Sequence, residues 1–204
     1  MSNLVLFLKK QGTIHVCTDF RDLNKDCPKD NFPTPFIDQI IDECAGHAML
    51  SFMDGFSGYN QVVICRADQL KTAFICPWGI FAYQFMPFGL KNTGATFQRA
   101  MSYFFHDLTH IILAYLDNLT AHSKHRVQHL HDLRTIFLRC RKYNICLNPL
   151  KCVFGIPVGR LLGFIVSKDG INLDPLKFQS ILELPIPRTL CQLQSLQGKA
   201  NFLH

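Results

Sequence analysis

The sequence predicts an α+β fold in which an antiparallel sheet is backed by helices on one face. Short β-rich runs separated by turn residues predict the strands, and two segments with apolar residues at helical spacing predict the backing helices. The 204 residues are 48% hydrophobic and only 18% charged, which is enough to bury a sizeable core. The formal net charge of +6 suits a polyanionic partner without demonstrating one.

Strands and turns dominate the N-terminal half. Residues 4–8 and 14–17 read as a hairpin turning at Gly12, with a basic tip at Lys9. Residues 19–29 have the composition of a loop, and residues 36–43, which follow Pro35, carry isoleucines on one helical face. Further strands are predicted at residues 49–53, 61–65, 72–76 and 81–85.

Two amphipathic helices flank an apolar hairpin in the second half. The first helix is expected at 94–107 and the second at 126–143. The residues predicted to face inward are Phe97, Met101, Phe104 and Phe105 in the first, and Val127, Leu130, Leu133, Phe137 and Cys140 in the second. Later elements are strands near 153–154, 161–166 and 171, a turn at 167–170 and a helix at 192–203.

The nine cysteines favour neither a disulfide framework nor zinc, because no Cys-x-x-Cys pair occurs and no secretory leader opens the chain. Reduced, mostly buried thiols in an intracellular, non-secreted protein are expected. His125 and His129 have the spacing of a helical metal pair, but Arg126 stands where a zinc protease motif has Glu, which favours a solvated helix face. No apolar stretch is long enough to cross a bilayer, so a soluble protein is expected.

Two aspartates follow strand-like runs. Asp54 comes after residues 49–53, and Asp117 lies at the tip of the apolar hairpin. A carboxylate between buried strands loses solvation unless a positive charge meets it, and two such acids can hold a pair of divalent cations. Turn and helix-cap chemistry also explains aspartates at such positions, so both interpretations stay open from the residues alone.

Several motifs in order resemble the reverse transcriptase domain of gypsy-type LTR retrotransposons, most closely the lineage of plant genomes. They are Asp19-Phe20-Arg21-Asp22-Leu23-Asn24-Lys25, Met53-Asp54-Gly55-Phe56-Ser57-Gly58-Tyr59, Met86-Pro87-Phe88-Gly89-Leu90, Ala95-Thr96-Phe97-Gln98, Tyr115-Leu116-Asp117 and Leu162-Gly163-Phe164. The resemblance covers nearly the whole chain.

The resemblance implies a right-hand polymerase. Fingers would span residues 1–30 and 62–92, and palm residues 31–61 and 93–170. Residues 171–204 would begin the thumb or connection, with the thumb mostly absent. It implies DNA synthesis from dNTPs on an RNA or DNA template with a DNA primer, using two Mg²⁺ ions that Mn²⁺ could replace. No membrane partner is implied.

The family's functional positions map onto this chain residue by residue. Asp54 and Asp117 match two of its three catalytic, metal-binding aspartates. The nucleotide-binding positions are Lys9, His15, Tyr59 and Phe88, of which Tyr59 would select against a 2′-hydroxyl. The primer- and template-binding positions are Leu162, Gly163, Lys151 and Lys168.

Two departures from the family weaken the expected activity. Asn118 occupies the position of the third catalytic aspartate, which removes a negative charge from a site that holds cations. His15 replaces an arginine that clamps the triphosphate, so a permanent cation becomes an imidazole that is mostly neutral at pH 7. A partial, degenerate and impaired reverse transcriptase is therefore expected. The alternative is a catalytically silent remnant that at most binds nucleic acid.

Overall fold

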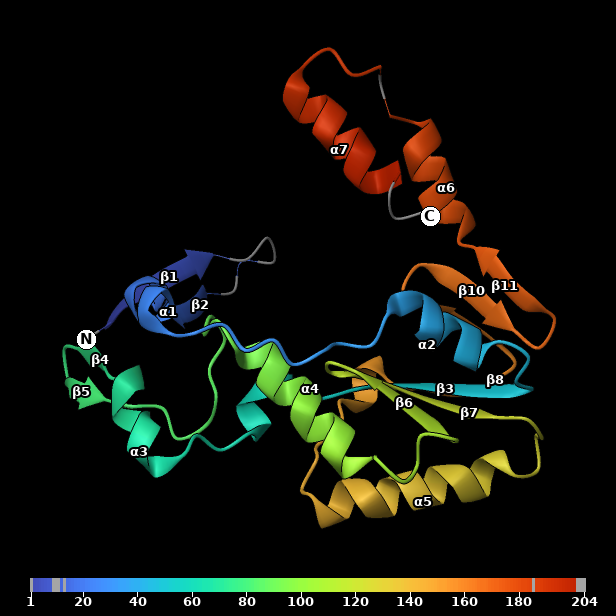
Figure 1. The fold of residues 1–204 in the computed structure, drawn as a ribbon, viewed down its shortest axis with the longest axis horizontal. Helices are drawn as coiled ribbons and strands as arrows, with labels where there is room; N and C mark the ends of the chain where they lie inside the picture. Colours follow the sequence, from blue (N-terminus) through green and yellow to red (C-terminus); the bar gives the residue numbers. More distant parts are fainter. Residues whose placement is uncertain (1, 9–11, 13, 185, 201–204) are drawn as a thin grey trace.

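The computed structural model describes residues 2–8, 12, 14–184 and 186–200. It confirms the α+β class, since the described residues form three sheets with helices packed against them (Figure 1). The strand orders are β2-β1-β4-β5, β6-β7-β3-β8 and β11-β10-β9.

The first sheet lies at one end of the molecule. Strands β1 (Ser2–Leu8) and β2 (Ile14–Thr18) form the predicted antiparallel hairpin. Strand β4 (Phe74–Cys76) runs parallel to β1 and pairs antiparallel with β5 (Gly79–Phe81). Helices α1 (Arg21–Asp26) and α3 (Arg66–Gln69) lie with this sheet, away from the larger part of the chain (Figure 1).

The second sheet is antiparallel throughout. Its strands are β3 (Met49–Asp54), β6 (Ile112–Tyr115), β7 (Asn118–Ser123) and β8 (Val153–Ile156). Strands β6 and β7 form the predicted apolar hairpin, with Tyr115 paired to Asn118 across a two-residue turn. Helices α4 (Thr93–Phe104) and α5 (His129–Lys142) cover one face. Helix α2 (Ile37–Cys44) and the third sheet cover the other face, so helices do not lie on one face only.

Alternation along β3 divides the core into two clusters. Met53 packs on the α4 and α5 side with the predicted stripe residues Phe97 and Met101. Leu50 packs on the α2 side with Ile40. Because successive side chains of a strand point to opposite faces, Asp54 shares the face of Leu50. The candidate catalytic acid therefore lies on the side covered by the third sheet.

The third sheet contains β9 (Val158–Leu161), β10 (Phe164–Ser167) and β11 (Gly170–Leu173). Helices α6 (Pro175–Leu182) and α7 (Leu190–Ala200) follow, contact each other and project from the rest of the chain (Figure 1). The predicted helix at 192–203 thus begins two residues earlier, and its residues 201–203 lie outside the described part. Single turns of 3₁₀ helix occur at η1 (Gly58–Gln61), η2 (Leu70–Thr72) and η3 (Pro149–Lys151).

Four local predictions were wrong. The strand predicted at 81–85 is displaced, because β5 ends at Phe81 and only an isolated bridge at Phe85 follows. The 19–29 segment contains α1, whose first N–H, that of Arg21, is held by the Asp19 carboxylate. Residues 61–65 form no strand beyond a single bridge at Val63, because η1 occupies the start of this segment. Residues 161–166 form two strands, since Leu162 and Gly163 turn the chain with φ of 49° and 93°.

The buried face of α5 also differs from the prediction. Val127 is 94% exposed and Leu130 is 79% exposed, whereas Leu133 and Cys140 are buried as expected. The helix begins only at His129, and that imidazole takes an inward position because it hydrogen-bonds to buried serines of β3 and β7. Tertiary hydrogen bonds therefore decide which face of α5 is buried.

All nine cysteines are free, but only Cys44 and Cys140 are buried, so the expectation of mostly buried thiols was wrong. Burial raises the pKa of the Cys44 thiol to about 12 and that of Cys140 to about 11. Within the described residues no helix is long and apolar enough to cross a membrane.

Candidate active site

The turn between β6 and β7 places Asp117 beside the end of β3. Its residues are Leu116, which has a left-handed φ of 52°, and Asp117. The N–H of Gly55, the residue after Asp54, donates to the Asp117 carbonyl oxygen at 2.9 Å. A backbone hydrogen bond thus ties the two predicted catalytic acids to one edge of the sheet.

Asp54 and Asn118 are register partners on neighbouring antiparallel strands. Opposed residues of such a pair lie close together on the same face of the sheet. The Asp54 side chain is 17% exposed, and Asn118 is exposed at the start of β7. The Asn118 amide nitrogen lies 3.5 Å from Oδ1 of Asp117, which is too long for a strong hydrogen bond, so this contact contributes little to the position of either side chain.

A lysine occupies the space in front of Asp54. The Lys151 ammonium lies 3.1 Å from Oδ2 of Asp54. Both side chains line a cavity of about 130 Å³ together with Asn118, Arg160 and Leu162. The sequence predicts Lys151 as a phosphate contact, and within the protein its ammonium pairs with the first candidate catalytic carboxylate.

Gln98 of α4 holds the Asp117 turn and received no role from the sequence. Its Nε2 donates to the Ala114 carbonyl at 2.9 Å, and its Oε1 accepts from the Leu116 N–H at 2.7 Å. The side chain is only 1% exposed. A glutamine beside Phe97 in an otherwise apolar stripe was the signal that could have identified it, because a buried amide needs buried partners.

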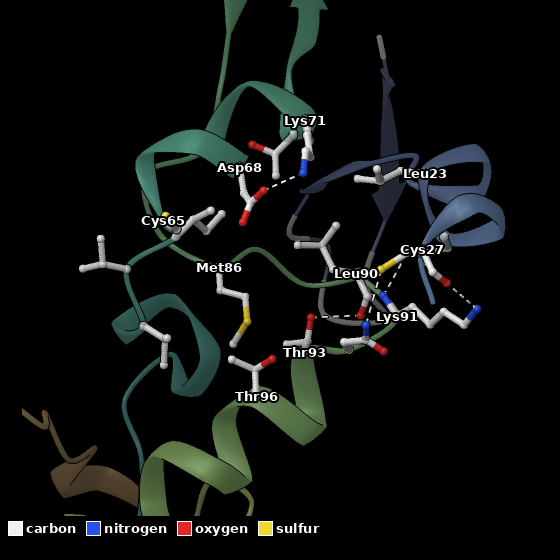
Figure 2. A pocket seen from close by; sticks show the side chains of 16 residues that line it. Leu23, Cys27, Cys65, Asp68, Lys71, Met86, Leu90, Lys91, Thr93 and Thr96 are labelled. Carbon is white, nitrogen blue, oxygen red and sulfur yellow. Dashed lines mark hydrogen bonds and ion pairs between the residues drawn. The ribbon is translucent and has the colours of Figure 1, made fainter. Parts of the chain in front are cut away.

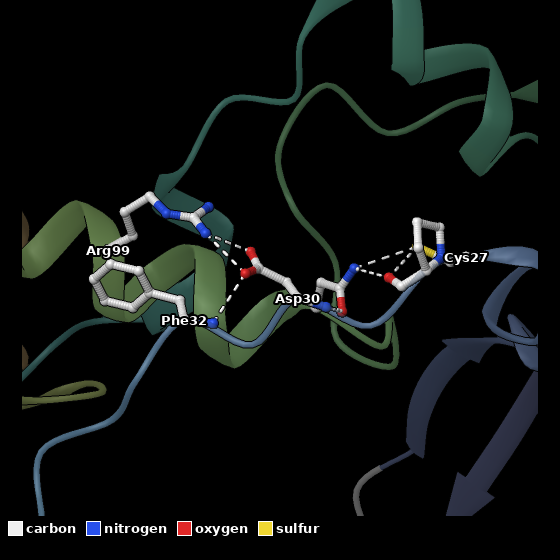
Figure 3. A network of polar contacts seen from close by, with 6 residues as sticks. Cys27, Asp30, Phe32 and Arg99 are labelled. Atoms are coloured by element: carbon white, nitrogen blue, oxygen red, sulfur yellow. Dashed lines mark hydrogen bonds and ion pairs between the residues drawn. The ribbon is translucent and has the colours of Figure 1, made fainter.

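A polar network anchors α4 to the segment that follows α1 (Figure 3). Arg99, the neighbour of Gln98, donates to both oxygens of Asp30 at 2.8 and 2.7 Å and stacks over the Phe32 ring. The hydrogen bonds from Arg99 lower the pKa of the Asp30 carboxyl. Asn92 accepts from the Asp30 N–H. The helix that holds the Asp117 turn is therefore connected to the part of the chain that carries the first sheet.

Tyr59 and Phe88, predicted to contact a nucleotide, lie against each other. Their ring centroids are 5.4 Å apart, and Tyr59 also packs edge-on against Phe97 at 5.3 Å. Burial, followed by the nearby Asp117 charge, raises the pKa of the Tyr59 hydroxyl. Gly58 passes so close to the acid that an added Cβ would lie 3.3 Å from the Asp117 Cβ. The structure thus brings the aromatic pair to the Asp117 turn.

The other predicted contacts are more dispersed. Leu162 lines the cavity of Asp54, and Gly163 completes the turn between β9 and β10. Lys168 is exposed in the turn between β10 and β11 and does not line that cavity. Lys9 lies outside the described residues. His15 belongs to β2, but its side chain lies outside the described part.

A larger cavity, of about 410 Å³, separates the first sheet's helices from α4 (Figure 2). Leu23, Cys27 and Leu90 line it from one side, and Met86 and Thr96 line it from the other. Its walls are mainly apolar, and the candidate catalytic residues do not line it.

The histidines form no metal site in the described part of the chain, where no group of three possible His, Cys, Asp or Glu ligands is found. His125 is exposed but precedes α5 and so lies on no helix face, and His129, the first residue of α5, is 4% exposed. Its two nitrogens lie 2.7 Å from the Ser51 hydroxyl and 2.8 Å from the Ser123 hydroxyl. For His129 the solvated interpretation was wrong, because buried serines replace water as its partners.

The chain matches a family of nucleic-acid polymerases. Residues 7–172 match the family model for "Reverse transcriptase (RNA-dependent DNA polymerase)". The chain therefore belongs to the reverse transcriptase family.

Related sequences are transposon polyproteins. The Tf2-7 polyprotein of Schizosaccharomyces pombe is 27% identical over 202 residues, and the Tf2-3 polyprotein is 27% identical over 206 residues. Each match covers 98% of this chain but only 15% of the polyprotein. The chain thus corresponds to a small part of these relatives.

Similar solved structures share the fold at low sequence identity. A foamy viral protease-reverse transcriptase in complex with double-stranded DNA has a TM-score of 0.88 at 22% identity, over 98% of this chain and 35% of that one. The same viral protein in complex with an RNA/DNA hybrid has a TM-score of 0.83 at 22% identity, over 98% and 27% of the two chains.

Proposed function

We propose that this chain is the polymerising domain of a retrotransposon polyprotein of the plant-type lineage, and that it adds dNTPs to a DNA primer on an RNA or DNA template. The arrangement of Asp54, Asp117 and Asn118 at one edge of the second sheet carries this proposal. The DNA and RNA/DNA complexes of the similar viral proteins support the choice of a primer-template duplex.

The proposed cofactors are two Mg²⁺ ions, for which Mn²⁺ could substitute. Carboxylate oxygens are the hard ligands that Mg²⁺ prefers, and Asp54 and Asp117 supply them here. When bound, the ions would lower the pKa of the primer hydroxyl and neutralise the triphosphate during in-line transfer. Asp54 already has a cationic partner in Lys151, which is consistent with a site suited to positive charge.

The division into fingers (1–30 and 62–92), palm (31–61 and 93–170) and the start of a thumb (171–204) is part of the proposal. The first sheet with α1 and α3 would form the fingers, and the second sheet would form the palm. The network around Asp30 and Arg99 would then fasten the connector between fingers and palm to α4, close to the catalytic turn.

The nucleotide would lie over Tyr59 and Phe88. Tyr59 is fixed on two sides by aromatic rings, so its ring could exclude a 2′-hydroxyl with little freedom to move aside. The Leu162–Gly163 turn would contact the primer near Asp54, and Lys168 would contact phosphate farther from it. Lys9 and His15 stay predictions of triphosphate contacts.

Asn118 would make the enzyme slow. An aspartate here would attract a divalent ion at about 4 Å with roughly 8 kcal/mol at an effective dielectric near 20, most of which water and rearrangement cancel. A residual loss of about 3 kcal/mol in the transition state corresponds to a rate on the order of a hundredfold lower. This copy is therefore proposed to be impaired, in keeping with a degenerate element.

The test is primer extension on poly(rA)/oligo(dT) with Mg²⁺ and with Mn²⁺, comparing the natural chain, Asn118→Asp and Asp117→Ala. We expect Asn118→Asp to extend the primer about a hundredfold faster than the natural chain. Asp117→Ala should abolish extension. Silence of both the natural chain and Asn118→Asp would favour a catalytically silent remnant. Extension that survives Asp117→Ala would refute the site.

A further inference from the structure

We propose that Lys151 is a resident counter-ion of the metal site, whose ammonium holds the position on Asp54 that a divalent ion must take. Lys151 would therefore limit how tightly this chain binds metal. The inference rests on the proposed function, because it requires that Asp54 and Asp117 bind the metal.

The segment that carries Lys151 is attached to Asp54 itself. The Asn148 N–H donates to the Asp54 carbonyl oxygen at 2.8 Å, and the Lys151 N–H donates to the Asn148 carbonyl at 3.1 Å. The Asn148 side chain also accepts from the Leu150 N–H, which closes the single turn η3. Asp54 is thus held twice by one segment, through its backbone and through its carboxylate. This attachment keeps the ammonium near the acid.

Lys151 changes the net charge of the acid pair Asp54 and Asp117. Asp54 and Asp117 contribute two negative charges, Asn118 contributes none, and Lys151 cancels one of the two. The nearby Arg160 lies 3.7 Å from Asp174 and is occupied by that partner. With a net charge of −1 rather than −2, the acid pair attracts a divalent ion only about half as strongly.

Displacement of the lysine is possible without unfolding. The Lys151 side chain is 65% exposed, so its ammonium can move into water while the flexible stem stays attached to η3. Metal binding would exchange the Lys151–Asp54 ion pair for a metal–carboxylate contact. Removal of the ammonium should therefore tighten metal binding, whereas a positioning role for Lys151 would predict the opposite.

The experiment measures Mn²⁺ binding to the full chain without nucleotide, by the electron paramagnetic resonance signal of free Mn²⁺. Lys151→Gln should bind Mn²⁺ on the order of tenfold more tightly than the natural chain. Lys151→Arg, which keeps the charge, should match the natural chain. Lys124→Gln is the matched control, since it removes the same charge from an exposed position after β7, outside the cavity. Thermal unfolding without metal checks that each variant folds.

Asp54→Asn separates the two proposals. If it lowers Mn²⁺ affinity and Lys151→Gln raises it, the counter-ion role is supported. If Asp54→Asn lowers affinity but Lys151→Gln leaves it unchanged or weakens it, the counter-ion role is overturned and the metal site stands. If Asp54→Asn has no effect on Mn²⁺ affinity, the metal site of the proposed function is overturned, and the role of Lys151 with it.

Discussion

Replacement of Gln98 by methionine tests whether α4 positions the catalytic turn. Methionine keeps the length of the side chain but cannot donate to the Ala114 carbonyl, and its thioether sulfur is too weak an acceptor to replace the amide oxygen at the Leu116 N–H. Gln98 is 1% exposed, whereas Ala114 and Leu116 are partly buried, so each backbone group that loses its partner costs about 1–2 kcal/mol. We expect Gln98→Met to lower the free energy of unfolding by about 2–4 kcal/mol.

The same substitution should weaken metal binding. Leu116 has a left-handed φ of 52°, a conformation that costs a non-glycine residue roughly 1–2 kcal/mol and depends on its surroundings to persist. Without the Gln98 hydrogen bonds the turn can relax, and Asp117 would move relative to Asp54. Mn²⁺ affinity is then expected to fall severalfold, on a scale where each tenfold change is about 1.4 kcal/mol.

Gln69→Met is the matched control for this experiment. Gln69 is half-buried near the first sheet and donates one hydrogen bond to the Ile64 carbonyl at 3.1 Å. Its substitution should cost about 1 kcal/mol in urea denaturation and leave Mn²⁺ affinity unchanged. A Gln98→Met protein that loses stability but binds Mn²⁺ like the natural chain would refute the positioning role. An unchanged free energy of unfolding would refute the hydrogen-bond argument itself.

Two further predictions follow from close contacts and burial. Gly58→Ala should weaken Mn²⁺ binding and lower the free energy of unfolding by about 1–2 kcal/mol, because φ is +26° and the new Cβ would lie 3.3 Å from the Asp117 Cβ. The control is Gly198→Ala in α7, where a Cβ would meet no other part of the chain within 4 Å, so Mn²⁺ affinity should not change. Burial, and then the adjacent His47, lowers the pKa of His122 from 6.5 to about 4, so the unfolded chain binds more protons between these values. The lowered pKa of His122 contributes about 3 kcal/mol to the free energy of unfolding above pH 6.5, and this contribution is lost as the pH falls to about 4. In urea denaturation, the free energy of unfolding of His122→Phe should therefore depend less on pH over this range than that of the natural chain.

Hydrophobic periodicity predicted those elements whose own sequence decides their structure. Strand β3, the hairpin around Asp117 and helix α4 have clear apolar patterns, and the structure confirms them. The inward face of α5 was wrong because His129 is buried by serines from two distant strands, which periodicity cannot detect. Helix α1 was missed because it is short and has no buried residue to produce a pattern.

The sequence likewise predicted some features of the candidate site and missed others. Motif order and strand ends predicted the region around Asp54 and Asp117, because a carboxylate after an apolar run is visible in the sequence. The contacts that hold these acids were not visible. Gln98 lies 18 positions before Leu116 in the sequence. Strands β6 and β7 lie between Asp54 and Lys151 in the sequence. Only the folded chain brings these partners together.

The Asp117 turn is held by hydrogen bonds to its backbone, one from the Gly55 N–H and one to the Gln98 side chain, and neither depends on the charge of residue 118. The Gly55 N–H binds the Asp117 carbonyl, and Gln98 binds the N–H of Leu116. The Asn118 side chain is exposed and makes only a 3.5 Å contact. An amide at this position therefore changes the charge of the site and leaves its geometry intact. This is why one restored carboxylate is expected to raise the rate without any repair elsewhere in the second sheet.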